Sequence, residues 1–217
     1  MAAAAGEKVT DNSSSRKNIP ASLRWGAVIW LLIWIPSYWR TWGALNFLRL
    51  CDIAVILSCA GLWSRNYLLV SSQAVSSILP DFVWALDAGW RFFLGHHLIG
   101  GTEYLFDSHY PLWIRLLTLY HLVLPLVLLW TLNRIRYDPR GLAVQSAIAG
   151  IVFVASRLAG PVENVNYAFT DPFFHRSWGN ASCHLAVIFL FIVLVAYLPT
   201  HFLLRRLFPT FIGNDAL

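Results

Sequence analysis

The sequence has few charged residues. Only 12% of its 217 residues are Asp, Glu, Lys or Arg and 58% are hydrophobic, whereas a soluble domain carries about 25% charged residues. This composition excludes an ordinary soluble domain and indicates an integral membrane protein. The net charge is +5, but the basic residues lie beside apolar segments, where they set topology and contact anionic lipid head groups. We therefore expect membrane lipids as partners and no nucleic acid.

Cysteine is also scarce. The three cysteines, Cys51, Cys59 and Cys183, lie in apolar surroundings and form no CxxC pair. Cysteines in such surroundings usually pack as small hydrophobic residues. Their spacing therefore points to neither a thiolate metal site nor a redox motif.

An apolar leader is lacking as well. Residues 1–22 are small, polar and charged, without the hydrophobic stretch of a signal peptide, so we expect a disordered cytoplasmic N-tail. A membrane-spanning helix needs roughly 17–25 apolar residues, and six segments meet this requirement. They are residues 23–39, 45–63, 67–86, 111–132, 142–160 and 182–204.

These segments predict an all-α polytopic membrane protein with one six-helix domain over residues 23–207 and a cytoplasmic C-tail over residues 208–217. Residues 88–106 are apolar in part, but their charges and the Gly100-Gly101 pair argue against a seventh crossing. We expect a short interfacial or re-entrant segment there.

The basic residues predict the orientation, because cytoplasmic connections carry the excess of Lys and Arg. Three basic residues, Arg40, Arg91 and Arg176, fall on the side of the first, third and fifth connections. Both termini should therefore be cytoplasmic in a multi-pass protein of the cell membrane. The opposite side carries ten: Lys8, Arg16, Lys17, Arg24, Arg65, Arg134, Arg136, Arg140, Arg205 and Arg206.

Several ionisable residues lie inside the expected spans. At 1.5 Å per residue, Asp52 and Asp81 are roughly 10 and 8 Å from the outer ends of their spans, and His121 is about 15 Å deep. An ionisable side chain at depth costs at least about 2.5–3.5 kcal/mol on insertion scales, so it normally faces the bundle interior and marks a site. We expect a polar cavity in the outer half of the bilayer. Its candidate binding residues are Arg49, Asp81, Arg115, Arg157, Asn164 and Asn166.

His121 requires a hydrogen-bonding partner at this depth, and Asp52 is the nearest acid in expected depth. An Asp52–His121 pair would fix the imidazole tautomer and let His121 act as a general base toward a hydroxyl, a thiol or water. Cys51 is a candidate nucleophile, although it lies about 100° around the helix from Asp52. In the alternative interpretation Arg49 and Asp52 pair with each other, and the other arginines extend to the head groups.

Several motifs resemble a family of uncharacterised bacterial integral membrane proteins over most of residues 38–205. They are NFLRLCDIAVIL, HHLIGGTEYLFD before PLWIRLLTLYHLVLP, NRIRYDPRG and ENVNYAF. More distantly, FLxxxD in the second span and a histidine shortly before LP in the fourth are similar to the androgen-induced-gene, androgen-dependent TFPI-regulating and YwaF-like proteins. That group includes membrane threonine hydrolases of fatty-acid esters and lipid acyltransferases.

The resemblance implies that His121 is catalytic and that the location is a bacterial inner membrane. It places the threonine of the hydrolases at or near Arg49, so the nucleophile departs from the pattern and Cys51 is its substitute. We thus expect a lipid-active hydrolase or acyltransferase with His121, Asp52 and Cys51 as catalytic residues. The alternative is a non-catalytic subunit of a membrane complex, or a carrier of a lipid or a small anion.

No metal or cofactor is expected. His97, Glu103 and His109 lie close in sequence but lack a recognised zinc-ligand spacing. A haem between His121 and His184 would need two intramembrane histidines at matching depth. The sequence places only His121 clearly inside the membrane, so both sites stay weaker alternatives.

Overall fold

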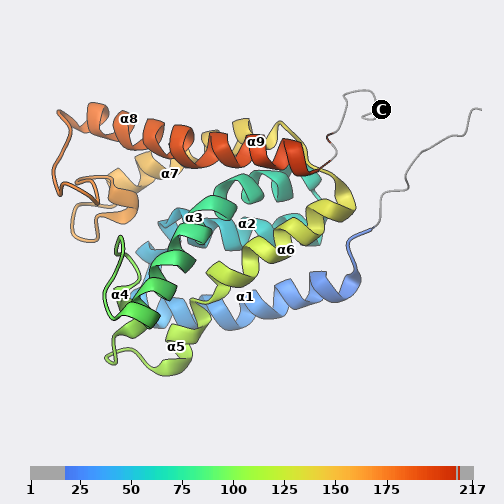
Figure 1. Ribbon diagram of the computed structural model, residues 1–217, viewed down its shortest axis with the longest axis horizontal. Helices are drawn as coiled ribbons and strands as arrows, with labels where there is room; N and C mark the ends of the chain where they lie inside the picture. The colour runs from blue at the N-terminus through green and yellow to red at the C-terminus, as the bar shows by residue number, and fades with distance from the viewer. Residues whose placement is uncertain (1–17, 209, 211–217) are drawn as a thin grey trace, which may run out of the picture.

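The computed structural model describes residues 18–208 and residue 210, and this part of the chain is helical without a strand (Figure 1). The expected N-tail and C-tail lie almost wholly outside it. The helices are α1 (Ala21–Trp42), the 3-10 helix η1 (Ala44–Leu48), α2 (Leu50–Ser64), α3 (Tyr67–Leu94), α4 (Glu103–Phe106), α5 (Leu112–Leu117), α6 (Tyr120–Ile135), α7 (Gly141–Leu158), the 3-10 turn η2 (Val165–Tyr167), α8 (Ala181–Ile192), the π-helical η3 (Val193–Tyr197) and α9 (Leu198–Leu207).

The helices form a bundle with its long connections at one end (Figure 1). The connections that contain α4 and η2 lie at that end, and α1 begins at the opposite end, where α9 also finishes. The central helix is α3, which packs against α2, α6 and α7. Helix α3 therefore contacts both α2 and α6, the helices that carry Asp52 and His121.

Helix α3 begins and ends at recognisable signals. The Asn66 side chain caps its first turn by accepting a hydrogen bond from Leu69 N–H at 3.0 Å, and Gly95 ends it with a φ of 80°, which glycine adopts without strain. The helix runs eight residues beyond the expected span end at residue 86. The expected interfacial segment 88–106 is thus partly wrong, because its first residues continue α3 and only residues 103–106 form a separate short helix.

The fourth expected span is interrupted. Helix α5 ends at Leu117 and α6 begins at Tyr120. Between them the Thr118 hydroxyl donates to Arg115 O at 2.6 Å, and such side-chain bonds compete with the helical backbone pattern. The break places Tyr120 and His121 in the first turn of a new helix.

The sixth expected span contains a widened turn. A π-helical stretch, η3, separates α8 from α9, and Pro199 is the second residue of α9. Proline has no N–H to complete the helical ladder, and irregular turns of this kind bend a helix. Helix α9 then approaches α3.

A buried amide network joins α3, α7 and η3. Gln145 Nε2 donates to Ser76 Oγ at 2.9 Å and to Tyr197 Oη at 3.0 Å, and its Oε1 accepts from Gln73 Nε2 at 3.3 Å. Gln73 also donates to Ser72 Oγ at 2.9 Å. The network satisfies most polar atoms of side chains that lie entirely inside the bundle.

Four helical segments are long and apolar enough to cross a membrane: Tyr67–Leu94, Leu112–Ile135, Gly141–Leu158 and Ala181–Leu207. They correspond to the third to sixth expected spans. Helix α1 is not among the four, and α2 is a shorter apolar helix of 15 residues, because η1 takes the first residues of the second expected span. The structure thus has the helical class and four apolar segments that the sequence predicts.

Candidate functional site

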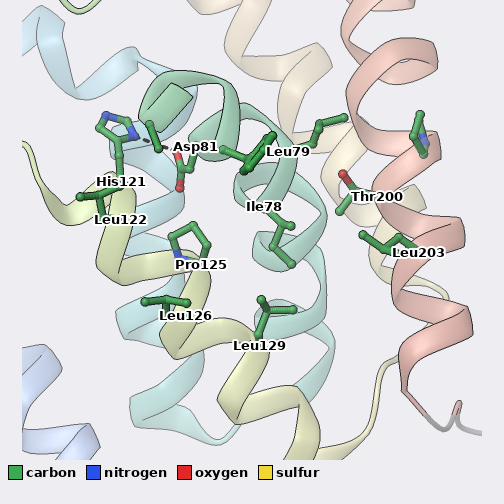
Figure 2. Close-up of a pocket in the computed structure, with 13 residues that line it drawn as sticks. Ile78, Leu79, Asp81, His121, Leu122, Pro125, Leu126, Leu129, Thr200 and Leu203 are labelled. Atoms are coloured by element: carbon green, nitrogen blue, oxygen red, sulfur yellow. Dashed lines mark hydrogen bonds and ion pairs between the residues drawn. The ribbon is translucent and has the colours of Figure 1, made fainter. Parts of the chain in front are cut away.

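His121 and Asp81 form a buried hydrogen-bonded pair. His121 Nδ1 lies 2.7 Å from Asp81 Oδ1, and only 6% and 2% of the two residues' surface is exposed. When Asp81 is ionised, its carboxylate can only accept a hydrogen bond, and Nδ1 then carries the proton and Nε2 the lone pair. Figure 2 shows Nδ1 facing Asp81 and the second ring nitrogen on the other side of the ring. Nε2 makes no hydrogen bond within the described residues.

The acid that orients His121 is Asp81, and the sequence-based choice of Asp52 is wrong. Asp52 Oδ1 instead accepts from Tyr120 Oη at 2.8 Å, and its other oxygen accepts from the Asn46 amide. The expected depth of either acid allows a contact with His121. The direction in which the helix points each side chain decides which acid makes the contact, and the position of a residue along the helix does not specify that direction.

Aromatic rings enclose the imidazole on both faces. The Trp84 ring stacks on it at 4.6 Å between centroids and 21° between planes, and the Tyr120 ring stacks at 4.2 Å and 28°. Trp84 is itself fixed, because its Nε1–H donates to Tyr104 Oη at 2.8 Å. The Asp81 bond and the two rings together hold the imidazole in one orientation. Asp52 contributes indirectly, because its hydrogen bond holds the Tyr120 ring that stacks on His121.

The pair lies at one end of an apolar cavity of about 600 Å³ between α3, α6 and α9. In Figure 2 the cavity extends from Asp81 and His121 past Pro125 toward Leu129 and Leu203. Leu126 and Leu203 are also exposed on the outside of the bundle, so the cavity opens sideways. Its remaining walls are Ile78, Leu79, Phe82, Ala85, Leu122, Pro199 and Thr200.

The three arginines proposed as binding residues, Arg49, Arg115 and Arg157, do not line this cavity. Arg49 Nε donates to Asn46 Oδ1 at 3.0 Å. Arg115 donates to Leu105 O at 3.3 Å, and Arg157 donates to Ala168 O at 2.9 Å and lies over the Phe169 ring. They bind backbone and neighbouring side chains at the end of the bundle with the long connections.

Asn164, Asn166 and Cys51 also lie outside the cavity wall. The Asn164 side chain closes its own loop by accepting from Phe169 N–H at 2.9 Å. Asn166 joins the loop to the bundle, since Oδ1 accepts from Leu50 N–H at 2.9 Å and Nδ2 donates to Leu48 O at 2.7 Å. Cys51 is half-buried on α2 next to Asp52.

The stretch after α3 is organised by Asp87, a residue that the sequence did not single out. Asp87 Oδ1 accepts from the N–H groups of Leu98, Ile99 and Gly100 at 2.7–3.0 Å, and Oδ2 lies 3.0 Å from His97 Nδ1. The sequence signal was an acid on the last turns of a helix before a glycine-rich loop with free N–H groups. This arrangement holds the loop and explains why a charge is tolerated in α3.

The residues that the structure describes contain no group of three or more His, Cys, Asp or Glu that could hold a metal. His184, the second candidate haem ligand, uses both ring nitrogens. Its Nδ1 accepts from Trp178 N–H at 3.2 Å, and its Nε2 lies 2.9 Å from Tyr167 O. His184 therefore has no ring nitrogen available to bind a haem iron, and the alternative of a His121–His184 haem site is not supported.

The chain is thus a helical protein with four membrane-length apolar segments and an Asp–His pair at the end of an apolar cavity. Comparison with known proteins adds no relative: neither a model of a protein family, nor a curated protein, nor a solved structure matches this chain.

Proposed function

We propose that the chain crosses the membrane six times with both termini in the cytoplasm. Helices α1 and α2 supply the two crossings beyond the four long apolar segments. Two observations support the proposal: the expected cytoplasmic connections gather at the end of the bundle where α1 begins, and these connections carry most of the basic residues.

For the activity, we propose a lipid-active hydrolase or acyltransferase in which His121 is the general base and Asp81 its orienting acid. The observation that carries this proposal is the buried Asp81–His121 hydrogen bond at the end of an apolar cavity that opens sideways. In the proposed reaction Nε2 takes the proton from water or a lipid hydroxyl as its oxygen attacks an ester carbonyl. Asp81 stabilises the imidazolium that forms, and the imidazolium then gives this proton to the alcohol oxygen of the ester as its bond to the carbonyl carbon breaks and the alcohol leaves.

The nucleophile in this proposal is water or a substrate hydroxyl. Cys51, the sequence-based candidate, does not line the cavity, so it has no role in the proposed reaction. The resemblance of residues 38–205 to the bacterial family and to the wider hydrolase and acyltransferase group supports the same class of reaction through His121, and it remains part of the proposal.

The test is turnover of a panel of lipid esters by the purified protein in lipid nanodiscs, with water or a lipid alcohol as acceptor. His121→Ala should lower kcat/KM by about 10²–10⁴-fold, the usual contribution of a general base. Asp81→Asn should also lower it, because the amide no longer favours the imidazolium. His109→Ala is the matched control, since His109 lies in the exposed connection before α5 and should keep parental turnover.

Equal turnover of the parent, His121→Ala and Asp81→Asn, with all three folded by thermal melting, would reject the enzyme proposal. A parent without turnover that purifies in fixed ratio with other membrane subunits, or with a bound lipid or anion, would favour the non-catalytic alternative.

A further inference from the structure

The cavity beside His121 contains one polar atom that no contact within the protein explains. Asp81 Oδ2 is buried and has no hydrogen-bond partner within the described residues. Figure 2 shows it directed away from His121, toward Pro125 and the cavity. Since a buried oxygen without a donor is unfavourable, a donor from a ligand is the natural partner.

Apart from His121, whose second ring nitrogen lies on the side of the ring away from Asp81 (Figure 2), the other walls of the cavity offer no competing polar group. Thr200 is the remaining polar side chain on the wall, and its hydroxyl donates to Ala196 O at 2.8 Å within its own helix. From His121 to Leu129 the wall follows α6 for about 12 Å. The volume of about 600 Å³ lies within the range of roughly 300–1,000 Å³ that holds one small ligand.

We infer that this cavity binds one straight-chain lipid whose polar end carries a hydroxyl. The hydroxyl donates to Asp81 Oδ2, and the alkyl chain lies along α6 toward Leu129 and Leu203. The inference also names a substrate class for the proposed enzyme, and only this step from bound lipid to substrate rests on the proposed function. A partial acyl ester of a polyol has a free hydroxyl close to its ester group, so the anchored lipid presents that ester near His121.

Binding is tested without turnover, on the full chain in phosphatidylcholine nanodiscs, with radiolabelled dodecanol and dodecyl methyl ether as probes. The two probes share their chain and oxygen, but only the alcohol donates a hydrogen bond. Dodecanol should bind at least about tenfold more tightly, as expected for a hydrogen bond to a charged group. Asp81→Asn should reduce this preference to less than about threefold. Equal affinity of both probes for the parent would overturn the inference.

The direction of the chain is tested with a matched pair of variants on α6. Leu129→Trp fills the far end of the cavity and should weaken octadecanol about tenfold more than octanol, whose chain is too short to reach Leu129. Val127→Trp is the control, because Val127 lines a separate apolar cavity between α1, α2 and α6, and it should leave both affinities unchanged. If Leu129→Trp weakened both alcohols equally, or had no more effect than Val127→Trp, the placement of the chain would be wrong.

Failure of this inference and failure of the enzyme proposal give different results. A parent that prefers dodecanol but turns over no ester retains the binding site and loses the proposed reaction. A parent that hydrolyses or transfers esters through His121 without a preference for the hydroxyl retains the reaction and overturns the inferred anchor.

Discussion

The contact between α7 and α3 leaves no space for a side chain at Gly141. An added Cβ would lie 2.9 Å from the Ser71 carbonyl carbon, 3.0 Å from Ser72 N and 3.2 Å from Ser71 Cβ. Two of these three atoms belong to the α3 backbone, which cannot move away without displacing the central helix. The preceding turn is held on α3 as well, since Asp138 N–H donates to Ser71 Oγ at 3.0 Å.

Gly141→Ala should therefore destabilise the protein. Overpacking of a filled interior costs about 1–3 kcal/mol, and the helix preference of alanine over glycine returns at most about 1 kcal/mol. The expected net loss is about 1–2 kcal/mol. At about 2–4 °C per kcal/mol for a chain of this size, the melting temperature should fall by about 2–8 °C.

The assay is thermal unfolding in one detergent, followed by the fluorescence of the 11 tryptophans. Gly150→Ala on the same helix is the matched control. An added Cβ at Gly150 would meet only Phe189 Cε2, at an ordinary 3.8 Å, so this variant should melt at or above the parental temperature. Equal shifts for both variants, or a Gly141→Ala protein as stable as the parent, would refute the close contact between α7 and α3.

Two further predictions concern topology and pH. Cys183 is exposed at the start of α8, whereas Cys59 is buried and Cys51 half-buried, so a membrane-impermeant maleimide should label Cys183 in intact cells; labelling only after lysis would contradict the proposed orientation. At Asp138, burial raises the carboxyl pKa, but hydrogen bonds from the side chain and backbone N–H of Arg140 outweigh it and hold the pKa below its usual value. The free energy of unfolding should thus be larger for the parent than for Asp138→Asn, with the full difference present above pH values of about 4–5. The difference should shrink as the pH falls below about 3.9, the pKa of Asp in an unfolded chain. Melting of both proteins at neutral pH and near pH 3 checks this, and a constant difference would contradict it.

The C-terminal boundary of α3 shows what a span prediction from charge and apolar runs leaves out. The third span was expected to end at residue 86, before a stretch whose charges argued against a further crossing. In the folded protein Asp87 accepts N–H groups from the loop that follows, so the helix continues to Leu94. The cost of the charge is offset by contacts that form only when the loop folds back onto α3.

The sequence by itself determined the helical class, the approximate positions of the helices, and the four apolar segments of membrane length. These properties follow from runs of apolar residues, from caps such as Asn66 and Gly95, and from the fixed rise per residue of a helix. They are local, and neighbouring residues are enough to set them.

The tertiary structure decided which groups meet. Asp81 rather than Asp52 pairs with His121, Tyr120 and Trp84 enclose the ring, and α9 forms the third wall of the cavity. Each contact depends on how far a helix is rotated about its axis and where it bends, at the α5–α6 break and at η3. A shift of one residue turns a side chain by about 100° around the helix. A small difference in helix packing therefore changes which partner a side chain contacts, while the position of the residue along the helix stays nearly the same.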